Sequence, residues 1–219
     1  ANRAVHSEIH DNVITNHADE SRGIVLDLNS NWNRVYRNTV LTTGLHSRGI
    51  RVRDSDENEV FENEVRTQGE GANACEVGRN DMTHADSCAG NSFHDNLFET
   101  TGAGTQAIYI YEDAEGNSFA DNTLVSNFCG IRIADSPNNT FVRQHFVRGD
   151  SPEYYSDLSI LGTGTRFNTP STGNVLLDPV ADSPLVFIWG TGTWDLAVSY
   201  TCTVRVTDTT GNSVSGATT

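Results

Sequence analysis

A short motif that recurs along the chain is the feature that most restricts its fold. The motif is N-x-Φ-x-x-N, where Φ is an apolar residue. In chain order, its copies are Ser7–Ile9–Asn12, Asn33–Val35–Asn38, Asn58–Val60–Asn63, Asn91–Phe93–Asn96, Asn117–Phe119–Asn122 and Asn139–Phe141–Gln144. The first and the last of these copies are degenerate. Successive copies begin 26, 25, 33, 26 and 22 residues apart. A period of this length is typical of a solenoid of stacked coils.

A second motif, a small residue followed by apolar residues at alternate positions, lies about half a period after the first. Its copies are Gly23-Ile24-Val25-Leu26, Gly49-Ile50-Arg51-Val52, Ala74-Cys75-Glu76-Val77, Ala107-Ile108-Tyr109-Ile110 and Gly130-Ile131-Arg132-Ile133. Alternation with period two predicts short β-strands, and the Gly, Asn and Asp residues between them predict turns. No long segment has the period of an amphipathic helix, which excludes α/β and leucine-rich repeat folds.

The two motifs together predict an all-β protein, a right-handed single-stranded parallel β-helix of about six rungs over residues 1–178. Neighbouring rungs should lie about 4.8 Å apart and pair along their strands. Two inward ladders of apolar side chains are expected: Ile24, Ile50, Ile108 and Ile131 in one, and Leu26, Val52, Val77, Ile110 and Ile133 in the other. Asparagines at matched turns should adopt left-handed backbone angles and bond to the asparagines above and below.

Two segments, "GIRVRDSDENEVFENEV" and "GIRIADSPNNTFVRQHF", resemble the repeats of the NosD-like and carbohydrate-binding/sugar-hydrolase group of parallel β-helix proteins. That group includes periplasmic copper-maturation proteins, pectin- and alginate-acting enzymes and archaeal surface proteins. The resemblance covers residues 1–178 and implies the fold more strongly than the function, because the repeated residues are those that the solenoid itself needs.

A change of pattern after residue 178 predicts a separate C-terminal β segment over residues 179–219. The run "VRVTDTTGNSVSGA", with a turn expected at Thr210-Gly211-Asn212, resembles the first hairpin of an immunoglobulin-like or carboxypeptidase-regulatory-like module. The segment would serve as a cap or as the start of such a module. Because the chain opens inside the repeat pattern at Ala1, we expect it to be a piece of a longer protein.

The net charge of −15 argues against nucleic acid as a partner, because phosphate binding needs a basic face. All 14 basic residues are arginine and none is lysine. An acidic surface without lysine resembles the proteins of halophilic archaea, in which carboxylates keep the surface hydrated. A GC-rich genome that favours Arg over Lys is the alternative. No stretch is long enough for a transmembrane helix, so membrane insertion is not expected.

Four cysteines are present, at spacings that do not suit a zinc site. Cys75 and Cys88 flank one loop, and we predict a disulfide between them, which would fit an oxidising extracellular compartment. Buried, reduced thiols are the alternative, and the sequence leaves the states of Cys129 and Cys202 open.

The outward positions of the second motif form the one surface with a directional character. Two tyrosines flanked by arginines and an acid could stack on sugar rings and pair with the carboxylates of a uronic acid or with a sulfated glycan. The alternative is an ordinary exposed strand face. The predicted carbohydrate-binding residues are Tyr109, Tyr111, Arg51, Arg53, Arg132 and Glu76.

Other candidate sites are weaker. Acidic turns that contain Asp54, Asp56, Glu112 and Asp113 could share Ca²⁺ through their oxygen atoms, although plain solubility explains them as well. A loop insertion carries Asp81, His84 and Asp86, and His17 and His46 could abstract protons, but no spacing demands it. Copper would favour clustered His, Met or Cys, whereas the single methionine, Met82, and the seven histidines are scattered. Catalytic residues are therefore not assigned, and no cofactor is expected beyond this weak calcium candidate.

These observations favour an extracellular surface β-helix that acts as a rigid stalk or display scaffold and binds polysaccharide. One alternative is a polysaccharide lyase, epimerase or hydrolase, which would bring three or more ionisable groups together in one groove. A second alternative is a filament-forming or viral adhesin, in which uncapped ends of the β-helix associate end to end.

Overall fold

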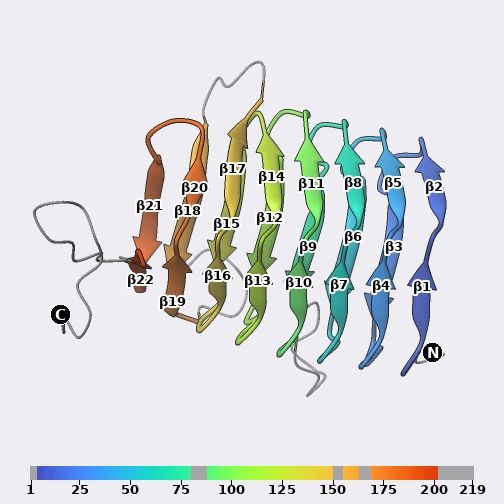
Figure 1. Cartoon of the computed structure of the whole chain (residues 1–219), viewed down its shortest axis with the longest axis horizontal. Coiled ribbons are helices and arrows are strands. Elements are labelled where there is room, and N and C mark those ends of the chain that lie inside the picture. Colours follow the sequence, from blue (N-terminus) through green and yellow to red (C-terminus); the bar gives the residue numbers. More distant parts are fainter. Residues whose placement is uncertain (1–3, 80–87, 150–154, 163–168, 202–219) are drawn as a thin grey trace, which may run out of the picture.

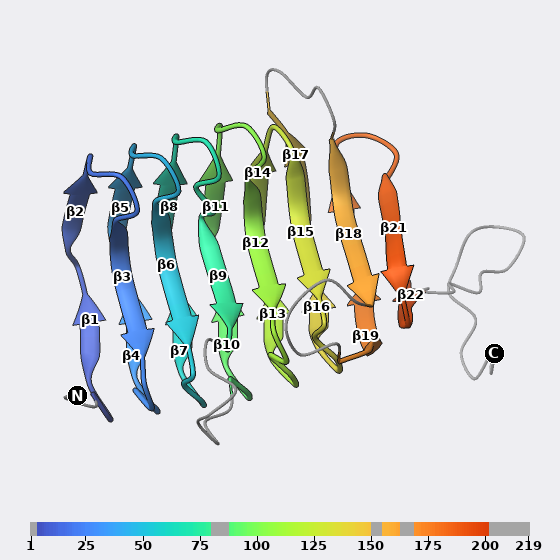
Figure 2. The same ribbon diagram turned by 180° about the vertical axis from the view of Figure 1, so that it is seen from behind.

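The computed structural model describes residues 4–79, 88–149, 155–162 and 169–201. These residues form β-strands and no helix, and they wind into one elongated solenoid (Figure 1). The paired strands are parallel and belong to three sheets that run along its length, as the view from behind also shows (Figure 2). The predicted right-handed parallel β-helix is confirmed. No helix of the described residues is long and apolar enough to cross a membrane.

The three sheets are built from one strand of each coil in turn. Sheet A contains β1 (Glu8–His10), β4 (Arg34–Tyr36), β7 (Glu59–Phe61), β10 (Ser92–His94), β13 (Ser118–Ala120), β16 (Thr140–Val142), β19 (Ser171–Leu177) and β22 (Trp194–Ser199). Sheet B contains β2 (Val13–Asn16), β5 (Thr39–Thr42), β8 (Glu64–Thr67), β11 (Leu97–Thr100), β14 (Thr123–Ser126), β17 (His145–Arg148) and β20 (Val180–Ala181). Sheet C contains β3 (Arg22–Asp27), β6 (Arg48–Arg53), β9 (Cys75–Gly78), β12 (Gln106–Tyr111), β15 (Cys129–Ala134), β18 (Ser156–Gly162) and β21 (Phe187–Gly192).

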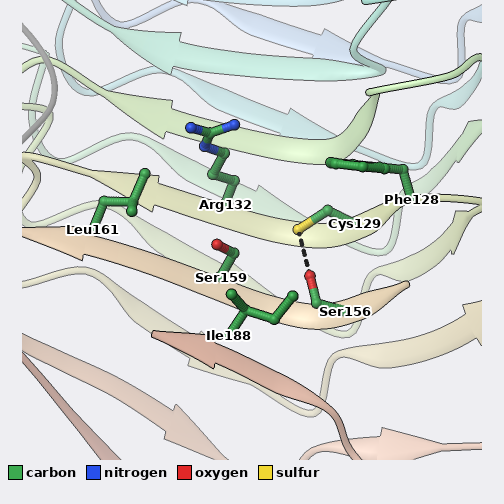
Figure 3. A pocket seen from close by; sticks show the side chains of 7 residues that line it. All are labelled: Phe128, Cys129, Arg132, Ser156, Ser159, Leu161 and Ile188. Atoms are coloured by element: carbon green, nitrogen blue, oxygen red, sulfur yellow. Dashed lines mark hydrogen bonds between the residues drawn. The ribbon is translucent and has the colours of Figure 1, made fainter. Parts of the chain in front are cut away.

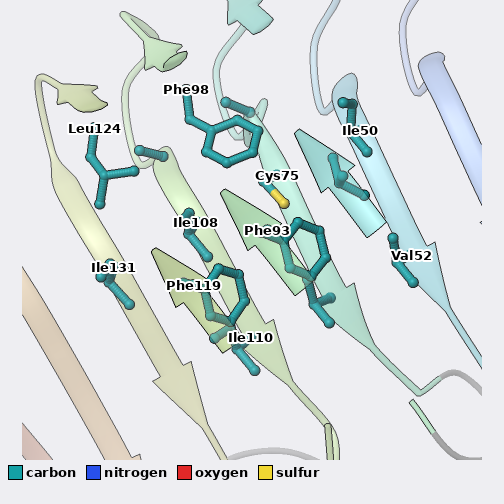
Figure 4. Close-up of a cluster of buried hydrophobic side chains, with 14 of the residues drawn as sticks. Ile50, Val52, Cys75, Phe93, Phe98, Ile108, Ile110, Phe119, Leu124 and Ile131 are labelled. Carbon is teal, nitrogen blue, oxygen red and sulfur yellow. The ribbon is translucent and has the colours of Figure 1, made fainter. Parts of the chain in front are cut away.

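The core lies between the three sheets and consists of apolar ladders, one residue per rung. All the side chains predicted to form the two ladders of sheet C are buried, which confirms the predicted register. Cys75 occupies the place between Ile50 and Ile108 in the first ladder. Sheet A adds the stacked rings of Phe93 and Phe119, whose centroids are 4.7 Å apart (Figure 4). A slip of one residue would turn these apolar side chains outward, so the core fixes the register.

Two asparagine ladders close the corners at either end of the sheet A strands. In each ladder the backbone N–H and the side-chain Nδ2 of one asparagine donate to Oδ1 of the asparagine on the next rung, over 2.9–3.2 Å. The first ladder runs from Asn33 to Asn174 and the second from Asn12 to Gln144. The predicted bonding between asparagines on neighbouring rungs is confirmed, and it satisfies polar groups that are buried from water.

The left-handed backbone angles lie one residue earlier than we predicted. In nearly every coil the residue immediately before the ladder position has a positive φ, and the residue at the ladder position does not. The ladder position holds asparagine in most coils, and Ser7, Gln144 or Pro179 in the others. The residues with a positive φ are His6, Trp32, Glu57, Gly90, Gly116, Asn138 and Gly173 at one corner, and Asp11, Arg37, Glu62, Asp95, Asp121, Arg143 and Asp178 at the other. The asparagine must aim its side chain along the solenoid, so its neighbour makes the sharp turn.

The solenoid continues past the boundary predicted at residue 178. Strands β20, β21 and β22 each add to one of the three sheets by parallel pairing, so no hairpin begins there in the described residues. The structure therefore has about seven turns where six were predicted. The predicted turn at Thr210 lies outside the described residues. The outermost described strands at the two ends are β1, β2 and β3, and β20, β21 and β22.

Ile108 tests the core register. Its side chain is fully buried, so Ile108→Ala should lower the free energy of unfolding by about 2–5 kcal/mol through lost burial and a residual cavity. Urea unfolding followed by circular dichroism measures this change. Val25→Ala, on the outer face of the same sheet, is the control and should cost much less. Equal losses in the two variants would contradict the assigned register.

Asn117 tests the first asparagine ladder. Asn117→Ala removes the Oδ1 acceptor of both the backbone N–H and the side chain of Asn91, which are buried. The variant should lose about 1–3 kcal/mol for each donor left without an acceptor, measured by the same unfolding experiment. Asn127→Ala is the control, because Asn127 donates to Thr101 at the surface. A loss in Asn117→Ala no larger than in this control would refute the structural role of the ladder.

Candidate functional site

The outer face of sheet C brings the predicted carbohydrate-binding residues onto successive rungs. One row crosses β6, β9, β12 and β15 through Arg51, Glu76, Tyr109 and Arg132, and it continues to Ser159 on β18. These positions alternate with the inward ladder residues, as strand geometry requires. The predicted common face is therefore present, although its members differ widely in burial.

Glu76 lies at the centre of a buried polar cluster and is only 2% exposed. Its carboxylate accepts hydrogen bonds from Arg48 Nε and Asn73 Nδ2, each over 2.9 Å, and Arg51 Nε lies 3.5 Å from its second oxygen. Arg51 Nη2 also donates to the phenolic oxygen of Tyr111 over 2.8 Å. We refer to these five residues as the Glu76 cluster.

The Glu76 cluster corrects our expectation that all six predicted residues lie open to solvent. Tyr111 is 9% exposed, and its burial raises the pKa of the phenol above the ordinary value of 10.0. Arg48 and Asn73 escaped the prediction because they lie just before the second motif, where the chain enters the strand. The charges of the cluster offset one another, as buried charges require, although Arg51 Nε has no hydrogen-bond acceptor in the described structure.

The guanidinium group of Arg53 is also paired with neighbouring carboxylates. This group forms hydrogen bonds through Nε and Nη2 to the carboxylate of Asp27 on the preceding rung, and Nε lies 3.8 Å from Asp54. Tyr109 and Arg132 are therefore the two predicted residues that belong neither to the Glu76 cluster nor to the Arg53–Asp27 pair.

Tyr109 and Arg132 form a partly exposed unit in the middle of sheet C. The Tyr109 ring stacks on Tyr111 with centroids 4.9 Å apart, and Arg132 Cζ lies 5.5 Å from the Tyr109 centroid. A guanidinium group over a tyrosine ring is attracted by the negative ring face. The stack holds the arginine side chain against the sheet at the point where a pocket begins.

The pocket has a volume of about 200 Å³ and lies over β15, β18 and β21 (Figure 3). It is lined by Phe128, Cys129, Arg132, Ser156, Ser159, Leu161 and Ile188. The Ser156 hydroxyl donates to Cys129 Sγ over 3.3 Å, and burial raises the pKa of this thiol to about 11. The thiol is therefore protonated at neutral pH, and a protonated thiol is a poor nucleophile. The pocket thus combines an apolar lining with hydroxyl groups and one guanidinium group.

The predicted disulfide is wrong. Cys75, Cys88 and Cys129 carry free, buried thiols. Cys75 points into the core ladder between Ile50 and Ile108, whereas Cys88 Sγ contacts the carbonyl oxygen of Val52 at 3.7 Å. The alternative of buried, reduced cysteines describes these three residues.

The acidic turns have backbone and ion-pair roles. No group of three or more His, Cys, Asp or Glu side chains that could hold a metal ion occurs in the part of the chain that the structure describes. Asp54, Glu112 and Asp113 have positive φ angles, Asp56 Oδ1 accepts from the backbone N–H of Ala89, and Asp113 pairs with Arg79. The predicted sharing of Ca²⁺ between these carboxylates has no geometric support there.

The remaining sequence candidates do not meet in one place that the structure describes. His17 Nδ1 lies 2.8 Å from the hydroxyl of Thr43 and is exposed, as is His46. The insertion that carries Asp81, His84 and Asp86 lies outside the described residues, as does Met82.

A second ordered surface, which the sequence analysis missed, lies on the outer face of sheet A. The rings of His10, Tyr36, Phe61 and His94 stack on successive rungs, with centroids 4.8, 4.9 and 5.1 Å apart. Their positions inside the first motif, two residues before each second asparagine, could have revealed this stack. The rings cover one another's faces, so the stack presents mainly ring edges to solvent.

His94, at one end of the stack, has two acidic partners. Nδ1 lies 2.9 Å from Asp95 and Nε2 lies 3.3 Å from Glu59. Partial burial lowers the pKa of His94, but the hydrogen bonds to these carboxylates outweigh it and raise the pKa above the ordinary value of 6.5. The stability that protonated His94 contributes is therefore fully present below pH 6.5 and is lost as the pH rises through its folded-state pKa.

Glu59 tests this coupling. Glu59→Gln removes one carboxylate, so the pKa of His94 should fall, which NMR titration of the imidazole carbon-bound protons measures. Glu64→Gln on sheet B removes the same charge at a distance and should leave the titration unchanged. An unaltered pKa in Glu59→Gln would show that the Glu59 contact does not favour the imidazolium.

Comparisons with known proteins support the fold. Residues 2–102 match the family described as periplasmic copper-binding protein (NosD), which is less than half of this chain. A search of the curated proteins gave no match. The structure is similar to the A-module of mannuronan C-5 epimerase AlgE4 from Azotobacter vinelandii, with a TM-score of 0.51 and 10% identity over 91% of this chain and 56% of that one. The chain thus spans about half the length of that module, and at this identity the likeness shows the fold alone.

Proposed function

We propose that this β-helix is an extracellular rigid scaffold that binds polysaccharide on the outer face of sheet C. The binding surface centres on Tyr109, Arg132 and the adjoining pocket, so it is narrower than the sequence predicted. The similar structure is named as an epimerase of the polysaccharide mannuronan, and the matched family is described as periplasmic. The epimerase name supports a polysaccharide ligand, and the family description supports a role outside the cytoplasm.

The observation that carries the proposal is the juxtaposition of Tyr109 and Arg132 with a pocket of about 200 Å³ on the outer face of sheet C. An aromatic side chain offers apolar area to a sugar ring, and the pocket can receive a substituent of that ring. Parallel strands hold these groups at fixed spacing, so little conformational entropy is lost on binding.

An enzyme that acts on polysaccharide is the second candidate, favoured by the Glu76 cluster. Three kinds of ionisable group meet there, as the sequence analysis required of an enzyme. Their mutual hydrogen bonds and burial support a structural role instead. Copper has no part in the proposal, because the described residues of the matched range hold no group of three or more metal-ligating side chains.

Tyr109 tests the binding surface. Tyr109→Ala should lower retention of the protein by an immobilised polysaccharide by up to about tenfold, because a ring that contributes about 0.5–1.5 kcal/mol of stacking energy is lost. Affinity electrophoresis in gels containing mannuronan, polygalacturonate or neutral dextran measures the retention. Phe61→Ala on sheet A is the matched control. Unchanged retention in Tyr109→Ala would exclude this surface, and release of modified sugar by the wild type would favour the enzyme.

A further inference from the structure

Arg132 differs from most other arginines that the structure describes. Nine of them have a carboxylate oxygen within 4.0 Å: Arg34, Arg37, Arg48, Arg51, Arg53, Arg66, Arg79, Arg143 and Arg148. Arg22 is exposed, and it donates to the backbone oxygen of Glu20. Arg132 has no carboxylate within this distance among the described side chains, although the chain carries a net charge of −15. In the part of the chain that the structure describes, this guanidinium group thus lacks a close carboxylate, although acidic residues outnumber basic ones.

The Nε atom of Arg132 also lacks a hydrogen-bond partner. This atom is buried and has no hydrogen-bond acceptor in the described structure. The Nε atoms of Arg51 and Arg148 share this property, but both of those guanidinium groups have a carboxylate within 4.0 Å. A buried donor without an acceptor costs about 1–3 kcal/mol, and more when the group is charged. Natural structures usually satisfy such donors. An unsatisfied donor on a guanidinium group that lines a pocket and has no carboxylate within 4.0 Å among the described residues points to an acceptor that arrives with a ligand.

The surroundings of Arg132 restrict the kind of acceptor. The tyrosine stack on one side fixes the guanidinium group, and Ser159 lies opposite it on the neighbouring strand, where it lines the same pocket. Phe128, Leu161 and Ile188 contribute apolar side chains to the pocket. A planar guanidinium group is suited to a carboxylate or a sulfate, which can accept two parallel hydrogen bonds. A volume of about 200 Å³ is large enough for one substituted sugar ring.

We infer that Arg132 and the pocket over β15, β18 and β21 form a subsite for the anionic substituent, carboxylate or sulfate, of an acidic sugar. The inference rests on the proposed polysaccharide binding and adds a preference for acidic over neutral chains. The anion supplies the acceptor for Arg132 Nε, and the sugar ring contacts Tyr109 and the apolar lining.

The test compares Arg132→Ala with Arg22→Ala, which removes the same charge from the same sheet at an exposed position. Retention by polygalacturonate and by dextran sulfate is measured for both, with neutral dextran as the uncharged polymer. Arg132→Ala should weaken retention by the acidic polymer that the wild type prefers about tenfold or more, whereas Arg22→Ala should change it little. Arg132→Lys keeps the positive charge but lacks the planar pair of N–H donors, so this variant should recover only part of the retention that Arg132→Ala loses. Thermal unfolding confirms that each variant is folded.

A second measurement separates the inference from the proposed function. The Nε–H resonance of Arg132, assigned by its absence in Arg132→Lys, is followed by NMR as free galacturonate or inorganic sulfate is added. A saturable shift without retention by any polymer would support the anion subsite and refute polysaccharide binding. Retention that depends on Tyr109 but not on Arg132 would overturn the subsite and leave the proposed function in place. No shift and no retention would overturn both.

Discussion

The constraint on which this structure depends is the hydrogen bonding of the corners. Parallel strands satisfy one another's backbone groups wherever the chain is extended, but each corner of a coil turns polar groups toward a dry interior. Asparagine solves this problem at both ends of the sheet A strands, because its side chain both donates and accepts. Each Oδ1 receives two donors from the neighbouring rung, so the ladders hold successive coils in register along the solenoid.

The fold could be predicted from the sequence because the ladders repeat. Ile50 and Ile108 stand at corresponding positions of their motifs, and period-two alternation determines that both face inward. The corner geometry was assigned to the wrong residue because a left-handed turn and a side-chain acceptor are separate requirements. In the structure Asp95 makes the turn and Asn96 supplies the ladder contact. The last coil was missed because its motif retains only Asn174 in recognisable form.

The sequence predicted which face of sheet C carries the candidate site, but it did not predict how deeply the residues of the site are buried. Strand alternation correctly turned Glu76 and Tyr109 to one side of sheet C. It could not show that Glu76 is surrounded by Arg48 and Asn73, because both contacts depend on side-chain length and rotamer. The contact with Arg48 also joins two neighbouring rungs. The stack that contains Tyr36 on sheet A was missed for a different reason. Its rings stand at regular positions between the asparagines of the first motif, and the prediction used only the asparagines and the apolar residues of that motif.

A solenoid separates the residues that make the fold from those that are free to make a site. Residues at inward and corner positions belong to the ladders that hold the coils together. An outward side chain such as Tyr109 can change without disturbing the packing of one coil on the next. Outward charges still have to be balanced, and along β6 and β9 they are, since Arg51 and Arg53 find carboxylates on adjacent rungs. The balance ends at Arg132, where the acids of the neighbouring rungs give way to Ser159 and apolar residues. On a surface where arginines are otherwise paired so regularly, an incomplete pairing is a more specific sign of a ligand than the tyrosines or the net charge.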